Sequence, residues 1–282
     1  MTALRAVADF LRADRLAAFG TVVLVLLLTM SLMAEHLPLG DATAIGVGPR
    51  LGPPTWAMPL GTDELGRSYL PRVVQGIRVT LLVAAFAVLL TAIMGTLIGM
   101  ISAYVGGWVD GLIMRLADVL FAFPALILGL LVAAALGPGL PAVVTVITTA
   151  TLPLFIRLVR AVTLSVVQRG FVTAAQVAGA SPLRIMLMHL LPNILGAVVV
   201  QLTYALSIGM IIESALSFLG LGVQPPFASL GSLLRSGAVY LTIAPWMVFA
   251  SGAVLSLAIM SVNLLGDGLR DRLDPLQGRS LK

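Results

Sequence analysis

Long apolar runs separated by short polar segments dominate this chain. A helix needs about 20 consecutive apolar residues to cross the hydrocarbon core of a bilayer. Six segments meet this requirement, and they cover residues 16–34, 79–105, 116–136, 140–156, 194–221 and 243–265. The pattern therefore predicts an all-α, polytopic membrane protein with six transmembrane helices.

Composition supports lipid as the main solvent of the chain. Of its 282 residues, 59% are hydrophobic and 10% are charged, whereas soluble domains carry roughly 25% charged residues. Its net charge of +5 does not indicate nucleic-acid binding, because the basic residues are spread among the loops between apolar spans. The absence of cysteine excludes disulfides and thiolate metal sites, and two histidines are too few for a histidine-rich metal site. We therefore expect no metal and no resident cofactor.

The distribution of basic residues predicts the orientation, since Lys and Arg concentrate in cytoplasmic loops. With both termini inside, 12 of the 17 basic residues fall on the cytoplasmic side. We therefore expect an N-in, C-in topology and divide the chain into three parts. Residues 1–78 hold the N-terminal tail, first span and outer loop, residues 79–270 form a five-helix core that includes an inner loop at 157–193, and residues 271–282 form a cytoplasmic tail.

The inner loop between the fourth and fifth spans reads as a helix, a sharp turn and a second helix. Residues 171–178 are good helix formers, and Gly179 can adopt the left-handed conformation that ends a helix. Ser181 followed by Pro182 is typical of a helix start, with a hydroxyl cap and proline at the first helical position. The second helix is expected to continue to Pro192.

This loop combines apolar side chains with no acidic residue. Val172, Val177, Ile185, Met186 and Met188 would expose an apolar surface next to the membrane. One interpretation is a docking element for a soluble partner, and the other is a helix pair lying on the lipid headgroups. The residues alone do not separate the two.

The same stretch resembles the EAA loop of the permease subunits of ABC importers. That pattern is E-A-A, three residues, Gly, nine residues, an aliphatic position, one residue, and Leu-Pro. The chain departs from it at Thr173, in place of the glutamate, and at His189, in place of the aliphatic residue. The resemblance implies that the loop couples to an ATPase through Thr173, Ala174, Ala175, Gly179, Ala180, Ser181, Pro182, Arg184, Leu191 and Pro192.

Further blocks resemble the peptide/nickel group of these permeases. They are LGTDELGR at 60–67, ESALSFLGLGVQPP at 213–226 and NLLGDGLRD at 263–271. The chain is thus similar to the second permease of dipeptide and oligopeptide importers, the DppC/OppC type, with the type I (MetI-like) fold. The resemblance implies a bacterial inner-membrane complex with a homologous permease, two ATPase subunits and an extracytoplasmic binding protein. Nickel chelates or haem-like ligands are alternative cargoes.

Energy for transport must come from another subunit. A phosphate-binding P-loop requires a lysine after its glycines, and the only lysine of the chain is its last residue, Lys282. The chain is therefore not expected to be an enzyme, and ATP with Mg²⁺ would be bound by the partners. A different class, a secondary transporter without ATP, would need coupling-ion groups in the membrane and usually an internal repeat.

A few polar residues within the spans are candidates for function. Glu213 and Asn263 are predicted to lie on the pathway or at the interface between permeases. Glu213 would line the pathway or form a hydrogen-bonded contact between permeases, and Asn263 would bond across helices rather than contact cargo. Arg115 and Asp118, three residues apart, are predicted to form a structural ion pair. On the outer side, short helices are expected at 64–77, lying on the interface, and at 229–239.

Overall fold

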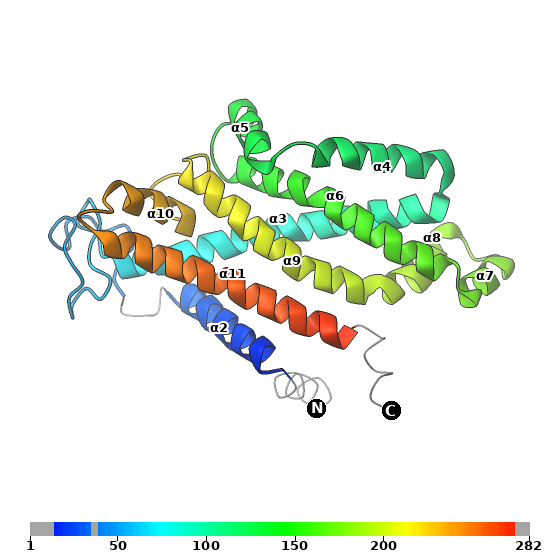
Figure 1. The fold of residues 1–282 in the computed structure, drawn as a ribbon, viewed down its shortest axis with the longest axis horizontal. Helices are drawn as coiled ribbons and strands as arrows, with labels where there is room; N and C mark the ends of the chain where they lie inside the picture. Colours follow the sequence, from blue (N-terminus) through cyan, green and yellow to red (C-terminus); the bar gives the residue numbers. More distant parts are fainter. Residues whose placement is uncertain (1–13, 35–38, 274–282) are drawn as a thin grey trace.

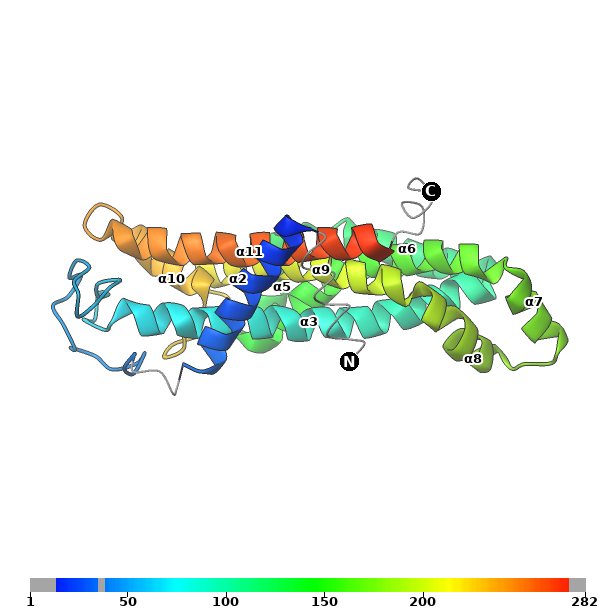
Figure 2. The same ribbon diagram turned by 90° about the horizontal axis from the view of Figure 1, so that it is seen from below.

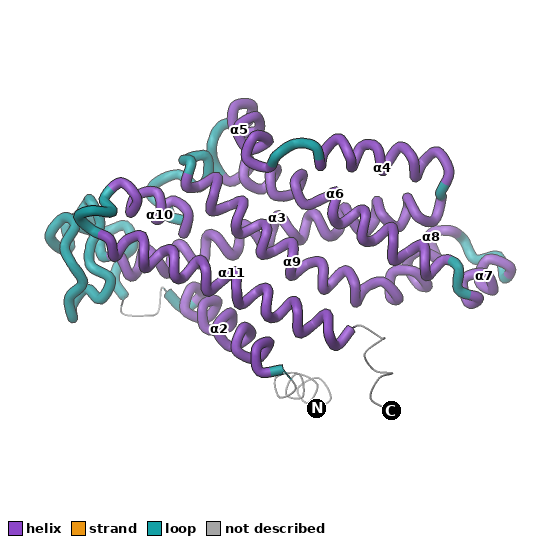
Figure 3. The backbone as a smooth tube through the Cα atoms, viewed as in Figure 1, coloured by secondary structure: helices purple, strands orange, loops and turns teal. Residues whose placement is uncertain are grey.

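The computed structural model describes residues 14–34 and 39–273, and the tails 1–13 and 274–282 of the predicted division lie outside the described residues. Every named element in that part of the chain is a helix (Figure 3). The elements, in chain order, are α2 (Arg15–Leu32), α3 (Tyr69–Val105), α4 (Gly107–Phe121), α5 (Ala125–Leu136), α6 (Leu140–Val167), α7 (Gly170–Val177), α8 (Pro182–Ile185), the π-helical turn η1 (Met186–Leu190), α9 (Leu191–Phe218), α10 (Leu230–Val239) and α11 (Pro245–Leu273).

The predicted transmembrane helices are confirmed, with one difference. Five of the described helices are long and apolar enough to cross a membrane, and α4 with α5 makes a sixth if that bent pair is one span. The third predicted span, 116–136, is wrong as a continuous helix because α4 and α5 meet at 88°. Pro124 lacks an amide hydrogen and disfavours helical backbone at Phe123, so the helix stops there and restarts in a new direction.

The long helix α3 begins earlier than its apolar run predicts. The separate interfacial helix expected at 64–77 is wrong, since α3 already starts at Tyr69. Tyr69, Val73 and Ile77 are buried against α10 and α11 rather than lying on a lipid surface. The Tyr69 hydroxyl donates a 3.0 Å hydrogen bond to the carbonyl of Met247, which ties the start of α3 to α11.

Small residues allow the central helices to pack closely. A Cβ added at Gly95 would lie 2.5 Å from Cβ of Phe155, and one at Gly99 would lie 2.8 Å from Cβ of Val159. The Gly-x-x-x-Gly spacing on α3 therefore marks the line along which α6 approaches. One core lies among α3, α6 and α9, and a second joins α2, α3, α10 and α11.

The two ends of the bundle differ in construction (Figures 1 and 2). The loop at 39–68 and α10 occupy one end, and α7 with α8 project from the other. The predicted helix at 229–239 is confirmed as α10, which begins with a reciprocal cap between Ser229 and Ser232. We call these the outer and inner ends, following the predicted orientation.

Candidate functional site

The inner loop is shorter than the predicted 157–193, because α6 continues to Val167; from here the name means residues 168–192. This loop contains the turn that the sequence predicts. Gly179 has φ +79°, in the left-handed region. Its amide donates to the carbonyl of Gln176 at 3.0 Å, and the amide of Ala180 donates to Ala175 at 3.0 Å. These two bonds form a Schellman motif, in which glycine ends the helix because it has no side chain to clash.

The second helix also begins as predicted but does not end where expected. The Ser181 hydroxyl accepts from the amide of Arg184 at 3.4 Å, and Pro182 is the first helical residue. The helix does not stop at Pro192, however, since α8, η1 and α9 form one apolar span over Pro182–Phe218. In η1 the amide of Leu191 donates to Met186 five residues earlier. This wider turn accommodates a proline, which has no amide hydrogen and would crowd a regular helix.

The apolar side chains of the inner loop divide into two groups. Val172 and Ile185 are fully buried, so the prediction that both are exposed is wrong; each anchors its helix to the bundle. Val177, Leu183 and Met188 remain 85%, 62% and 63% exposed. The loop is therefore held from one side while its other side presents apolar groups outward.

The remaining residues predicted to couple lie on or near this outward side. Thr173, Ala174, Arg184 and Pro192 are exposed, while Ala175, Ala180 and Leu191 are half-buried against the core. His189 contacts Phe171, with ring centroids 6.4 Å apart. The histidine that departs from the EAA pattern thus links α7 to the helix that follows it.

Glu213 is hydrogen-bonded, as one of the two predictions has it, and its partners lie within the chain. Its carboxylate is fully buried inside the chain and accepts hydrogen bonds from Thr80 at 2.8 Å and Ser217 at 2.7 Å. The Thr80 hydroxyl in turn accepts from the amide of Leu230 at 3.1 Å. Glu213 therefore joins α3, α9 and the start of α10, and a role at the pathway or between permeases stays a prediction.

Comparison with known proteins identifies the family. The family model for the binding-protein-dependent transport system inner membrane component matches residues 95–279. The chain belongs to this family.

Relatives support the same assignment over most of the chain. A putative peptide transport system permease protein of Brucella suis biovar 1 is 39% identical over 91% of this chain and 86% of its own length. The di/tripeptide transport system permease protein DppC of Pseudomonas aeruginosa is 41% identical over 80% of this chain and 76% of its own length. A solved structure of the MetNI methionine ABC transporter shares the fold, with a TM-score of 0.55, 18% identity, and coverage of 73% and 97%. The family and fold are those of ABC importer permeases, and they do not support a secondary transporter.

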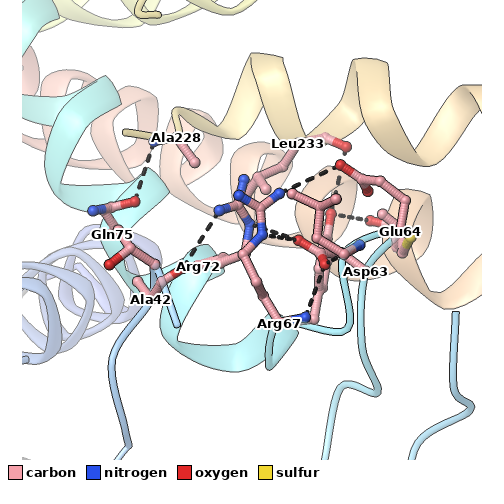
Figure 4. A network of polar contacts seen from close by, with 12 residues as sticks. Ala42, Asp63, Glu64, Arg67, Arg72, Gln75, Ala228 and Leu233 are labelled. Atoms are coloured by element: carbon pink, nitrogen blue, oxygen red, sulfur yellow. Dashed lines mark hydrogen bonds and ion pairs between the residues drawn. The ribbon is translucent and has the colours of Figure 1, made fainter. Parts of the chain in front are cut away.

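The outer end of this permease contains a buried polar cluster, which we call the outer network: Asp63, Glu64, Arg67 and Arg72 (Figure 4). Asp63 accepts a 2.6 Å hydrogen bond from Nε of Arg67 and forms an ion pair, without a hydrogen bond, with Nε of Arg72 at 3.2 Å. Its side chain is only 1% exposed. The Asp63 carboxylate also accepts from the amides of Leu65 and Arg67. The LGTDELGR block contains Asp63, Glu64 and Arg67 but not Arg72, and the burial of these residues does not follow from it.

The ion pairs at the inner end differ from the prediction. Asp118 pairs with Arg157 on α6, not with Arg115 on its own helix. One turn along α6, Arg160 binds Asp110 through two nitrogens. The predicted pair is wrong because α4 lies beside α6, and Arg157 and Arg160 on α6 pair with Asp118 and Asp110. Asn263 is half-buried on α11, and no hydrogen bond joins its side chain to another described residue. The predicted bond across helices is therefore not found in the described part of the chain, and a place at the pathway or the permease interface stays a prediction.

Proposed function

We propose that this permease is the second transmembrane subunit of an ATP-driven importer for dipeptides and oligopeptides, with its inner loop as the contact for the ATPase. The observation that carries the proposal is the outward apolar face of that loop, formed by Val177, Leu183 and Met188. An apolar face on a loop that is anchored and sharply turned suits a protein partner.

The partners follow from what the chain lacks and from its family. Lys282 is the only lysine, and it cannot belong to a P-loop. Two ATPase subunits would therefore bind ATP and Mg²⁺, and a homologous permease would complete the transmembrane pathway. An extracytoplasmic binding protein would deliver cargo at the outer end. The complex would reside in the cytoplasmic membrane of a bacterium.

Continuity of the helix gives the mechanism. When ATP binding closes the ATPase dimer, α7 and α8 move with it as one unit, because the Schellman turn at Gly179 and the contact of Phe171 with His189 hold them together. The movement passes through η1 into α9, since Pro182–Phe218 is one unbroken span. The bundle then changes from inward-open to outward-open.

Peptide cargo is supported by the printed names of the relatives, which are permeases for peptides, di/tripeptides and dipeptides. Nickel chelates and haem-like ligands are the competing cargoes within the same group. The experiment is uptake by cells that express the whole importer, with radiolabelled Ala-Ala and Ala-Ala-Ala compared with Ni²⁺–histidine and haem. Uptake of either metal compound, without uptake of either peptide, would overturn the cargo while leaving the coupling role intact.

Coupling is tested at Gly179. In Gly179→Val, a β-branched residue must adopt φ +79°, at a cost of about 1–2 kcal/mol or more. We expect cargo-stimulated ATPase activity and uptake to fall at least about tenfold while membrane insertion is retained. Gly179→Asn is the matched control, since asparagine tolerates this conformation, and it should keep most of the activity. Full transport by Gly179→Val would disprove the proposal that α7 and α8 pass the movement of the ATPase to the bundle.

A further inference from the structure

A groove between α6, α9 and α11 on the inner half of the bundle is not used by the coupling argument. Its volume is about 380 Å³. Leu158, Ala197 and Leu273 contribute apolar walls, and Gln201, Tyr204 and Arg270 contribute polar groups. A concave site with apolar walls and a few polar groups is the usual form of a ligand site.

The polar side of this groove is held in place across two helices. The Tyr204 hydroxyl on α9 donates a 2.7 Å hydrogen bond to the carboxylate of Asp267 on α11. The helices approach closely beside this bond, because a Cβ added at Gly266 would lie 3.0 Å from Cβ of Thr203. The positions of Tyr204 and Asp267 are therefore set by helix packing.

Two opposite sides of α9 have different chemistry at the same depth. The groove side carries Gln201 and Tyr204, whereas Leu195 and Val199 on the other side are 46% and 38% exposed. Arg270 lines the groove and Asp267 is exposed near it. The groove side therefore presents polar and charged groups, whereas the other side presents an apolar surface.

We propose that this groove is the inner part of the translocation route and that it is occupied by water and the passing peptide. The Arg270 guanidinium lines the groove and suits the carboxylate of a peptide, and the Asp267 carboxylate, held beside the groove by its bond to Tyr204, suits the ammonium group. Gln201 and Tyr204 supply hydrogen-bonding groups for peptide bonds. The assignment rests on the proposed function, and it places the route along α9, the helix that continues from the inner loop.

The natural absence of cysteine allows a direct test of water access. Gln201→Cys and Ala197→Cys place thiols in the groove, and Val199→Cys and Leu195→Cys place matched thiols on the other side of α9. The complete importer in inside-out vesicles is treated with a membrane-impermeant sulfonated maleimide, both without nucleotide and trapped with ATP and vanadate. Membrane-permeant N-ethylmaleimide, applied after denaturation, measures the total thiol in each variant.

We expect both groove thiols to react at least about tenfold faster than their controls in one of the two states, and excess Ala-Ala with binding protein and ATP to slow that reaction. Groove thiols that react no faster than Val199→Cys and Leu195→Cys in either state would overturn the proposal, by showing that a dry protein contact or lipid covers the groove. Fast labelling that Ala-Ala does not slow would also overturn the proposal, because the groove would then be a water-filled surface that the peptide does not pass. Labelling in the absence of peptide does not depend on which cargo is imported. Uptake of radiolabelled Ala-Ala decides the proposed function separately, and slowing by Ala-Ala is judged for an importer that takes this peptide up.

Discussion

The outer network and the inner loop lie at opposite ends of the bundle and differ in which groups they bury and which they expose. The outer network buries charge: the side chain of Asp63 is 1% exposed and contacts two arginines. The inner loop exposes apolar surface, with Val177 85% exposed. Each arrangement is the reverse of the usual preference for charge outside and apolar groups inside.

The difference shows where each of these two regions finds its contacts. At the outer end, Gln75 accepts from the amide of Ala228, and Arg72 donates to the carbonyl of Ala42, so the outer loop is bonded to α3 and the segment before α10 (Figure 4). At the inner end, α7 packs on α6 and α8, and its outward face is uncovered. The charged groups of the outer network therefore find their partners within the chain, whereas the apolar groups on the outward face of the inner loop do not.

The largest effect on stability is expected at the outer network. Asp63→Ala would leave Arg67 and Arg72 buried without their carboxylate, and breaking such a buried pair costs about 3–5 kcal/mol. Thermal unfolding of the importer in detergent, followed by protease access to the 39–68 loop, measures the loss. Asp41→Ala is the control, because Asp41 is an exposed acid of the same loop with local bonds to Thr43, and its cost should stay below about 1 kcal/mol. Equal losses in both variants would show that the outer network is not a stabilising centre.

A smaller effect is expected at the ion pair between Asp118 and Arg157, whose side chains are 63% and 40% exposed. A double-mutant cycle with Asp118→Ala and Arg157→Ala should give a coupling energy of about 0.2–1 kcal/mol, as for other exposed pairs. The matched cycle of Asp118→Ala with Arg115→Ala should give a coupling energy near zero. A larger coupling energy between Asp118 and Arg115 than between Asp118 and Arg157 would support the ion pair that the sequence predicts and contradict the one in the structure.

The smallest effect on stability is expected at the inner loop, where the effect on function is large. Val177→Asp should change the free energy of unfolding by no more than about 0.5 kcal/mol, because the side chain is 85% exposed. Binding of the ATPase subunits should nevertheless weaken by about tenfold or more, which corresponds to about 1.4 kcal/mol. Co-purification and titration of the ATPase measure this. Ile45→Asp, at an exposed apolar residue of the outer loop, is the control, and this variant should bind the ATPase normally. Unchanged binding by Val177→Asp would show that the inner loop is not the docking site.

Local backbone signals predict much of the inner loop. Gly179 and the Ser181–Pro182 pair act through the conformations that their own residues allow, and the structure has the turn and the helix start at these positions. Pro192 is a local signal that misleads, because the wider π-helical turn before it accommodates a residue without an amide hydrogen, and the helix continues. Pro124 is the converse case, where a proline within an apolar run interrupts a helix that hydrophobicity alone extends.

By itself, the sequence determined that this protein is a helical membrane protein, where most of its spans lie, where the inner loop turns, and that it cannot hydrolyse ATP through a P-loop. These features follow from hydrophobic length, from backbone preferences and from the residue types present, which need no knowledge of distant contacts. Only the tertiary structure decided that Glu213 is enclosed by Thr80 and Ser217, that Asp118 pairs with Arg157, and that Asp63 is the centre of a buried network. Partner choice for a polar side chain depends on which helices pack together, and residues far apart in the chain meet only after packing.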